Sequence, residues 1–229
     1  MTAAVIFDMD GPLLRLSDNE EQAYIAAITE MYGDSRISIS WDEYPIRTDT
    51  EITKHIIKEL TGYDATHEEL KKICEKYVRN LKHKLNKGNG AISTPGVMLL
   101  LQNLSRHMTL GVATGNFREI ASIRLRSAGL WRFFKTHCEG SGDGGTKAEI
   151  LARLTKNLPK TITRTLFVGD SISDLVAAKY CGVEFIGFSE SENRRKDLST
   201  AGCKLVAASH TQTEEFILEK SRDPKLSET

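Results

Sequence analysis

The sequence predicts an α/β protein with a doubly wound parallel-sheet (Rossmann-like) core and an inserted α-helical cap domain. Two observations predict the core: short apolar runs rich in β-branched residues recur along the chain, and helical patterns lie between them. This alternation is typical of parallel strands covered by helices on both faces. A third observation predicts the insert, because residues 15–90 replace the alternation with charged stretches whose apolar residues have a helical period.

The expected strands are short and mostly apolar. The first is the run at residues 3–7, which stops at two acids, as a buried parallel strand does when it ends at a site. Further strands are expected at residues 109–113, 134–137, 165–168, 184–188 and 204–206. Helices are expected between them, at about residues 96–107, 117–128, 147–157, 172–181 and 213–220.

The expected cap covers residues 15–90, and the expected core comprises residues 1–14 and 91–229. Turn signals at Gly33-Asp34 and Gly62-Tyr63 divide the cap, which is expected to close near residues 87–90. Two sets of apolar residues have helical spacing there: Ile52, Ile56, Ile57 and Leu60, and then Leu70, Ile73, Tyr77 and Leu81.

The composition does not favour a nucleic-acid or membrane partner. Lys+Arg and Asp+Glu are equal at 31 each, so no net field favours nucleic acid or an anionic membrane surface. No run approaches the ~20 apolar residues of a membrane span, and the N-terminus has no basic leader, so we expect a cytoplasmic protein. The four cysteines are scattered without a CxxC pair, which indicates reduced thiols rather than a zinc site.

Polar clusters follow four of the expected strands, where ligands of open α/β sheets bind. Three of the clusters have the spacing of helix capping boxes, and helix N-termini aimed at one edge of a sheet attract an anion. The sequence therefore predicts a phosphate site at this edge. The clusters are Asp8 with Asp10, Thr114-Gly115-Asn116, Gly144-Gly145-Thr146-Lys147, and Gly169-Asp170-Ser171 with Asp174. The expected capping boxes are Asn116 with Glu119, Thr146 with Glu149, and Ser171 with Asp174.

The acids in these clusters predict a metal. Asp8 and Asp10 flank one residue, so both can face the same side of an extended segment, and Asp170 and Asp174 lie one helical turn apart. Carboxylates gathered at one edge repel one another unless a hard cation neutralises them. Oxygen ligands of this kind suit Mg²⁺.

These residues resemble the four ordered motifs of the haloacid dehalogenase-like superfamily. The matching segments are FDMDG at residues 7–11, VATGN at 112–116, Lys147, and VGDSISDL at 168–175. The pair of DxDG and a downstream GDSxxD is specific, and the Thr and Lys motifs occur in the right order. The resemblance spans the core, and the helical insert after the first strand looks like that family's cap of the first type.

The resemblance implies a role for each motif residue. Asp8 would be the nucleophile that forms an aspartyl-phosphate, and Asp10 would serve first as general acid and then as general base. The implied phosphate-binding residues are Thr114, Gly115, Asn116 and Lys147. The implied Mg²⁺ ligands are the Asp8 carboxylate, the Asp10 main-chain carbonyl and the Asp170 carboxylate, with Asp174 in the outer shell of the metal.

The implied activity is hydrolysis of a small-molecule phosphate monoester. Dehalogenases of the superfamily lack an acid at the position of Asp10. Its presence in this chain therefore favours phosphoryl transfer over carbon–halogen cleavage. Residues 47–49 and 114–130 are similar to phosphoglycolate phosphatase-like members, so phosphoglycolate is one candidate substrate, with Arg47 or Arg15 as partner of its carboxylate. Pro12 stands where the family usually has Thr, and Arg15 where an acid is frequent, and both departures bear on substrate preference.

Other functions share parts of this pattern. A phosphomutase of the beta-phosphoglucomutase type would have every core motif and differ only in its cap. A phosphonate hydrolase would need a cap lysine that forms a Schiff base, and the cap lysines lie in patterns typical of solvated helix faces. A phospho-accepting signalling module resembles the chain less well, because its acceptor follows an interior strand and it has no inserted cap.

Overall fold

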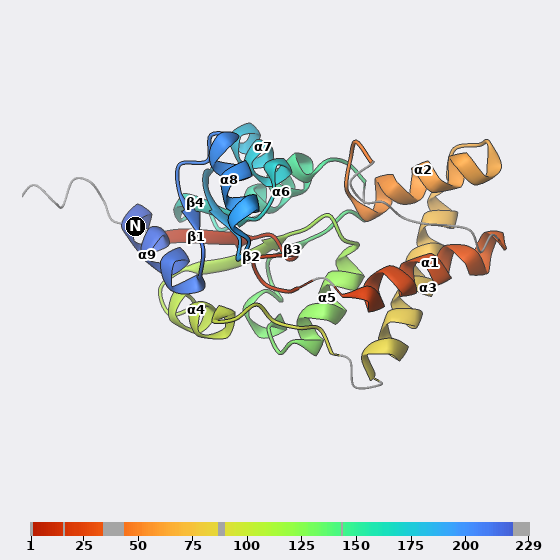
Figure 1. Cartoon of the computed structure of the whole chain (residues 1–229), viewed down its shortest axis with the longest axis horizontal. Helices are drawn as coiled ribbons and strands as arrows, with labels where there is room; N and C mark the ends of the chain where they lie inside the picture. Colours follow the sequence, from red (N-terminus) through yellow and green to blue (C-terminus); the bar gives the residue numbers. More distant parts are fainter. Residues whose placement is uncertain (1, 16, 34–43, 87–89, 143, 222–229) are drawn as a thin grey trace, which may run out of the picture.

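A six-stranded parallel sheet forms the centre of the molecule (Figure 1), in a computed structural model that describes residues 2–15, 17–33, 44–86, 90–142 and 144–221. The strand order β3-β2-β1-β4-β5-β6 confirms the predicted doubly wound core. The strands are β1 (Thr2–Phe7), β2 (Thr109–Ala113), β3 (Cys138–Glu139), β4 (Ile162–Gly169), β5 (Glu184–Phe188) and β6 (Val206–Ala207).

Helices cover both faces of the sheet (Figure 1). Val5 and Phe7 of β1 pack with α4 (Val97–Leu104), α5 (Arg118–Ser127) and α9 (His210–Ser221). Ile6, which points to the opposite face, packs with α6 (Lys147–Lys156) and α7 (Ile172–Cys181). All three side chains are fully buried, as expected for a strand covered by helices on both faces. Among the described residues, no helix combines the length and the apolar character that a membrane span requires.

Two elements of the core differ from the sequence-based expectation. The strand expected at residues 134–137 is wrong, because a 3-10 helix (η2, Trp131–Phe133) leads there into consecutive turns. The N–H groups of Phe134 and His137 donate to carbonyls within those turns, and β3 begins only at Cys138. Helix α8 (Glu192–Thr200) was not expected, because Leu198 is its only buried residue and it therefore has no apolar period.

Between β1 and α4 the described residues form three helices, α1 (Asp18–Tyr32), α2 (Asp49–Thr61) and α3 (His67–Asn86), which we call the inserted helices. They lie beyond the edge of the sheet at which β1 ends (Figure 1), and Phe117, which precedes α5, and Ile120 of α5 belong to their apolar cluster. The two predicted apolar sets supply much of this cluster, with Ile52, Ile56, Ile57, Ile73, Tyr77 and Leu81 buried.

The predicted turns of the insert have different outcomes. Gly33 and Gly62 have φ values of 74° and 81° and end α1 and α2, so chain reversals occur where they were expected. Asp34 lies outside the described residues, as do residues 87–89 at the expected closure of the cap. The division into a cap at residues 15–90 and a core therefore stays a prediction.

The start of α2 contacts the loops that follow β2 and β3. The Asp49 N–H donates to the Gly115 carbonyl at 2.8 Å, and the Thr48 hydroxyl donates to the Gly145 carbonyl at 3.1 Å. A Cβ atom on Gly115 would lie 2.7 Å from the carbonyl oxygen of Arg47. The backbone of the insert therefore sits directly on the loop after β2, and glycine permits this approach.

Gly115→Ala should lower the free energy of unfolding by about 1–3 kcal/mol, because the added methyl group overlaps the Arg47 carbonyl and the backbone must shift. Denaturant unfolding measures the change. Gly142→Ala is the matched control, since no atom lies within 4 Å of its added Cβ. An equal effect of both substitutions would contradict direct contact between α2 and this loop.

Candidate active site

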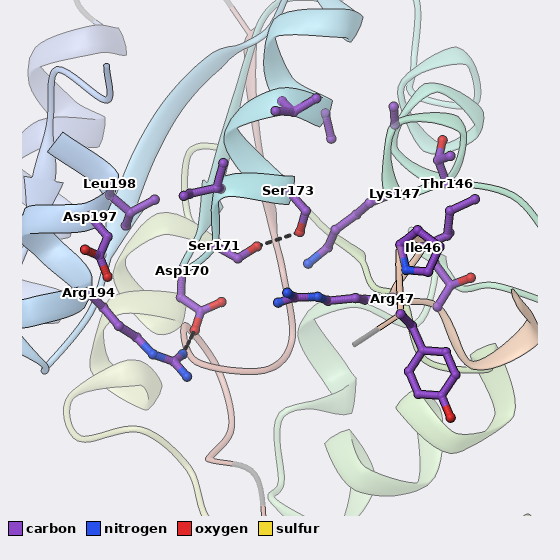
Figure 2. A pocket seen from close by; sticks show the side chains of 17 residues that line it. Ile46, Arg47, Thr146, Lys147, Asp170, Ser171, Ser173, Arg194, Asp197 and Leu198 are labelled. Carbon is purple, nitrogen blue, oxygen red and sulfur yellow. Dashed lines mark hydrogen bonds and ion pairs between the residues drawn. The ribbon is translucent and has the colours of Figure 1, made fainter. Parts of the chain in front are cut away.

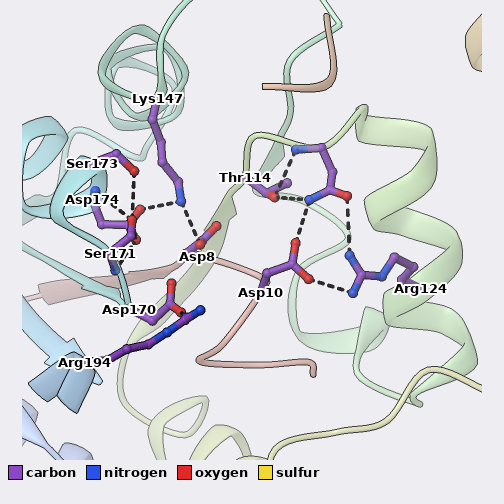
Figure 3. A network of polar contacts seen from close by, with 11 residues as sticks. Asp8, Asp10, Thr114, Arg124, Lys147, Asp170, Ser171, Ser173, Asp174 and Arg194 are labelled. Carbon is purple, nitrogen blue, oxygen red and sulfur yellow. Dashed lines mark hydrogen bonds and ion pairs between the residues drawn. The ribbon is translucent and has the colours of Figure 1, made fainter. Parts of the chain in front are cut away.

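Asp8 is the first residue after β1, and only 4% of its surface is exposed. Phe7 pairs with Val112 of β2 and with Val168 of β4, so Asp8 lies between the ends of these two strands. Its backbone N–H donates to the Val168 carbonyl at 2.8 Å. Its carboxyl group lies 2.7 Å from the Lys147 ammonium (Figure 3), so a buried carboxyl oxygen is held at this edge of the sheet.

Asp10 lies two residues further along, and its carboxylate is directed to α5 (Figure 3). Asn116 Nδ2 donates to one carboxylate oxygen at 2.8 Å, and Arg124 Nη2 donates to the other at 2.7 Å. The side chain keeps 29% of its surface exposed, so it remains accessible from the site. The two predicted catalytic acids therefore meet at one edge of the sheet with different cationic partners.

Lys147, the first residue of α6, bridges two acids. Its Nζ atom lies 2.7 Å from an oxygen of Asp8 and 2.5 Å from an oxygen of Asp174. The other oxygen of Asp174 accepts the Ser171 N–H at 3.1 Å, within the capping box of α7. Asp174 is fully buried, and through these two contacts it holds both the Lys147 ammonium and the start of α7.

Burial and mutual repulsion raise the pKa values of Asp8 and Asp170. Burial is the largest cause that raises the pKa of Asp8 well above 3.8, and Asp174 and Asp170 add to it while Lys147 opposes it. Burial, helped by Asp174, also raises the pKa of Asp170 to about 6, although Asp170 pairs with Arg194 at 2.7 Å. Burial opposes protonation of Lys147, but the Asp174 and Asp8 carboxylates outweigh it and raise the lysine pKa.

These acids fit a hard divalent cation. One carboxylate oxygen from each of Asp8, Asp170 and Asp174 lies within 4.8 Å of the others. A ligand set made only of oxygen suits Mg²⁺, and a cation there would favour the charged forms that burial disfavours. Coordination by Asp8, the Asp10 main-chain carbonyl and Asp170 stays a prediction. Asp174 is already held by Lys147 and Ser171, which fits its expected place in the outer shell.

Two of the three predicted capping boxes are confirmed, at Thr146 with Glu149 and at Ser171 with Asp174. The box predicted at Asn116 is wrong, because α5 begins at Arg118 and Asn116 does not cap it. The Asn116 side-chain amide instead donates to Asp10 at 2.8 Å and to the Thr114 hydroxyl at 3.1 Å. A phosphate-binding role for Asn116 therefore stays a prediction. A phosphate bound by its side-chain amide would have to compete with Asp10 and the Thr114 hydroxyl for that donor.

A carboxylate from the inserted helices takes the place of the missing cap. Asp49 of α2 accepts the N–H of Phe117, the residue before α5, at 2.8 Å. Asp49 is buried, with 7% of its surface exposed. Because a helix N-terminus attracts negative charge, this contact joins α2 to the helix that follows the predicted phosphate loop.

A cavity of about 200 Å³ lies between the end of the sheet and the inserted helices. All the predicted catalytic and phosphate-binding residues line it: Asp8, Asp10, Thr114, Gly115, Asn116 and Lys147. The insert contributes three acids to the opposite wall, Glu20, Glu21 and Asp49, together with Arg47, Ile52 and Tyr77. A second cavity of about 860 Å³ shares Arg47, Lys147, Ser171 and Ser173 with the first and reaches Asp170 and Arg194 (Figure 2).

The two arginines predicted as partners of a substrate anion lie in different places. Arg47 lines both cavities, and Figure 2 shows its side chain extending toward Asp170 and Ser171. Arg15 lines neither of these cavities and pairs with Glu190 at 2.7 Å, with about half of its side chain exposed (49%). Arg47 is therefore the candidate that can reach a substrate.

Sequence reasoning missed three charged residues near Asp10: Arg124, Glu20 and Asp49. Arg124 is fully buried and pairs with Asp10 and with Glu20 of α1. A signal for Arg124 was present, because it lies among Ile120, Ala121 and Leu125 on the apolar face of α5. An arginine at such a position needs a buried anionic partner. Glu20 and Asp49 had no comparable signal, since their partners come from distant segments.

The sequence matches one protein family over most of its length. A profile of haloacid dehalogenase-like hydrolases matches residues 5–188. No curated protein matches the chain closely enough to count as a relative.

Solved structures are similar over nearly the whole chain. A hydrolase from Pseudomonas syringae is 20% identical with a TM-score of 0.66, covering 96% of this chain and 99% of that one. A protein described as a predicted phosphatase from Clostridium acetobutylicum is 19% identical with a TM-score of 0.65, covering 96% and 99%. A protein from Bacteroides vulgatus, provisionally assigned as a beta-phosphoglucomutase, is 19% identical with a TM-score of 0.62, covering 95% and 88%. At this level of identity the likeness shows the fold.

Asp49 should make the stability depend on pH. Burial raises its pKa from 3.8 to about 7, although the bond from Phe117 opposes the shift. Between these values the folded protein binds the proton more readily than the unfolded chain, so the free energy of unfolding should fall as the pH rises. From about pH 5 to about pH 8, Asp49→Asn should remove on the order of 2 kcal/mol of that fall.

Denaturant unfolding at several pH values, with a chelator present, measures this difference. Asp64→Asn is the control, because the Asp64 side chain is 86% exposed. Parallel curves for the wild type and Asp49→Asn would contradict the buried carboxylate.

Proposed function

Since the chain belongs to the haloacid dehalogenase-like hydrolase family, we propose that it is a Mg²⁺-dependent phosphatase that hydrolyses a small phosphate monoester through an aspartyl-phosphate on Asp8. The observation that carries the proposal is the pair of acids after β1. Asp8 is buried beside Lys147, whereas Asp10 is held by Asn116 and Arg124 at the same edge of the sheet. In this proposal one acid attacks phosphorus and the other moves a proton.

In the first step a carboxylate oxygen of Asp8 attacks phosphorus while the bond from phosphorus to the leaving oxygen breaks. Protonated Asp10 gives its proton to the leaving oxygen, so the alcohol departs neutral and Asp10 becomes a carboxylate. Lys147, the Thr114 hydroxyl and the Gly115 N–H stabilise the charge on the phosphoryl oxygens.

In the second step water attacks the phosphorus of the aspartyl-phosphate. The Asp10 carboxylate takes a proton from this water, phosphate leaves, and Asp8 is restored as a carboxylate. Asp10 ends protonated, ready for the next substrate. When bound by Asp8, Asp170 and the Asp10 carbonyl, Mg²⁺ would supply positive charge that offsets the crowded carboxylates and the phosphoryl group.

The proposed substrate is a small-molecule phosphate ester. The cavity of about 200 Å³ has room for a phosphate and a small leaving group between Asp8 and the inserted helices. We propose that residues 15–90 act as a cap that excludes water from the first step and selects the leaving group. Phosphoglycolate is one candidate, with Arg47 as the cation for its carboxylate.

Asp8→Asn should lower turnover by several powers of ten while the protein stays folded, because an amide does not attack phosphorus. The measurement is phosphate release from glycolate, sugar and nucleotide monophosphates assayed side by side, with circular dichroism as the folding check. A variant that keeps more than about a tenth of the wild-type rate would rule out Asp8 as nucleophile. Isomerisation of a sugar phosphate without phosphate release would favour the phosphomutase instead.

Chelation should abolish the activity, and added Mg²⁺ should restore it, because the gathered carboxylates need a cation. Ca²⁺ should inhibit, since its larger and looser ligand shell misplaces Asp8. Asp170→Ala should weaken metal binding, measured by titration calorimetry, more than Asp174→Ala does. Full activity in metal-free buffer would contradict the metal site.

Arg47→Ala should lower kcat/KM for the best natural substrate by about 10- to 100-fold, because a charge-assisted contact is lost. The rate with 4-nitrophenyl phosphate should change little. Arg15→Ala is the matched control, since Arg15 pairs with Glu190 outside both cavities. Equal losses on both substrates would show that Arg47 acts on the site in general and not on specificity.

A further inference from the structure

Arg124 is the largest fully buried side chain in the described part of the chain. It lies on α5, among apolar residues that pack against the core. Enclosing a guanidinium costs several kcal/mol unless anionic partners compensate it. The identity of those partners therefore indicates what the arginine is for.

Its partners come from both sides of the candidate active site. Nη2 donates to Asp10 at 2.7 Å, in the loop after β1 (Figure 3). Nε lies 3.0 Å from an oxygen of Glu20 on α1, close enough for an ion pair although the two groups are not aligned for a hydrogen bond. Glu20 is itself buried, with 3% of its surface exposed. One cation thus joins Asp10, the proposed proton donor, to an inserted helix.

The contacts fix how the Asp10 carboxylate is turned. Arg124 occupies one of its oxygens and Asn116 occupies the other, so rotation of the carboxylate would break at least one bond. Arg124 Nη1 also lies 3.4 Å from the Asn116 side-chain oxygen, which steadies the second donor. Proton transfer needs the acid within hydrogen-bond reach of the leaving oxygen, and small displacements lower the rate steeply.

We propose that Arg124 is a positioning residue that orients the Asp10 carboxylate for proton transfer, and that Glu20 makes this orientation depend on α1 being docked. The inference rests on the proposed function of Asp10. Stability alone does not require the charges, because a buried ion-pair cluster can often be replaced by apolar residues of similar volume without loss of stability. The arrangement instead lets the inserted helices adjust the acid through one intermediate side chain.

The test compares two substrates that differ in how much they need the acid. Phenyl phosphate has a poor leaving group that must be protonated, whereas 2,4-dinitrophenyl phosphate has a good one that departs without help. With a covalent intermediate, kcat/KM reports only the steps up to departure of the alcohol. Arg124→Met should therefore lower kcat/KM for phenyl phosphate by about 10- to 100-fold and that for the dinitrophenyl ester by less than about 3-fold.

Arg126→Met is the matched control, because Arg126 lies on the same helix, is exposed and rests on the Trp131 ring. Glu20→Gln, which keeps the shape of the side chain, should show the same discrimination between the two esters at a smaller size, about 3- to 10-fold. If Arg124→Met does not fold, Glu20→Gln carries the test alone.

The outcomes separate the two proposals. Equal losses on both esters, or no loss on either, would overturn the positioning role. An effect of Arg124→Met without any effect of Glu20→Gln would overturn the dependence on α1. If the wild type hydrolyses neither ester, or if Asp8→Asn hydrolyses them at the wild-type rate, the proposed function fails first.

Discussion

Repulsion among buried carboxylates is the constraint on which the rest of this site depends. Asp8, Asp10, Asp170 and Asp174 are gathered at one edge of the sheet, and each lies beside a cationic side chain. Lys147 lies between Asp8 and Asp174, Arg194 on Asp170, and Arg124 on Asp10. Burial, together with Asp174 and Asp170, raises the pKa of Asp8 despite the Lys147 ammonium, and a bound cation would oppose that shift.

The sheet brings the acids together through its register. Parallel strands end at the same edge, so residues that follow β1 and β4 become neighbours although about 160 residues separate Asp8 from Asp170 in the sequence. Glycine at residues 11 and 169 permits the close approach, since a Cβ atom at these positions would lie 2.6 Å from Asp170 and 2.5 Å from Asp174. The acids can therefore lie close together because Gly11 and Gly169 have no side chain that would collide with Asp170 and Asp174.

Local sequence patterns predicted most of the fold and the segments that carry the candidate site residues. The run that ends at Asp8, and the capping boxes at Thr146 and Ser171, involve residues close in sequence, so the pattern contains the whole interaction. The errors arose where distant segments decide the outcome. Asn116 has the spacing of a helix cap, but Asp10 binds its side chain and Asp49 replaces it. Helix α8 escaped notice because it buries one residue only.

The carboxylate of Asp49 that closes the start of α5 comes from a residue 68 positions earlier in the chain. The Phe117 N–H at the start of α5 therefore keeps this acceptor only while α2 rests on it, and the same contact shields the amide from solvent. If the inserted helices lift away, this amide becomes free to exchange its proton for deuterium. The rate of hydrogen–deuterium exchange at the Phe117 amide would therefore report how often the inserted helices leave the core, and it can be measured without a substrate.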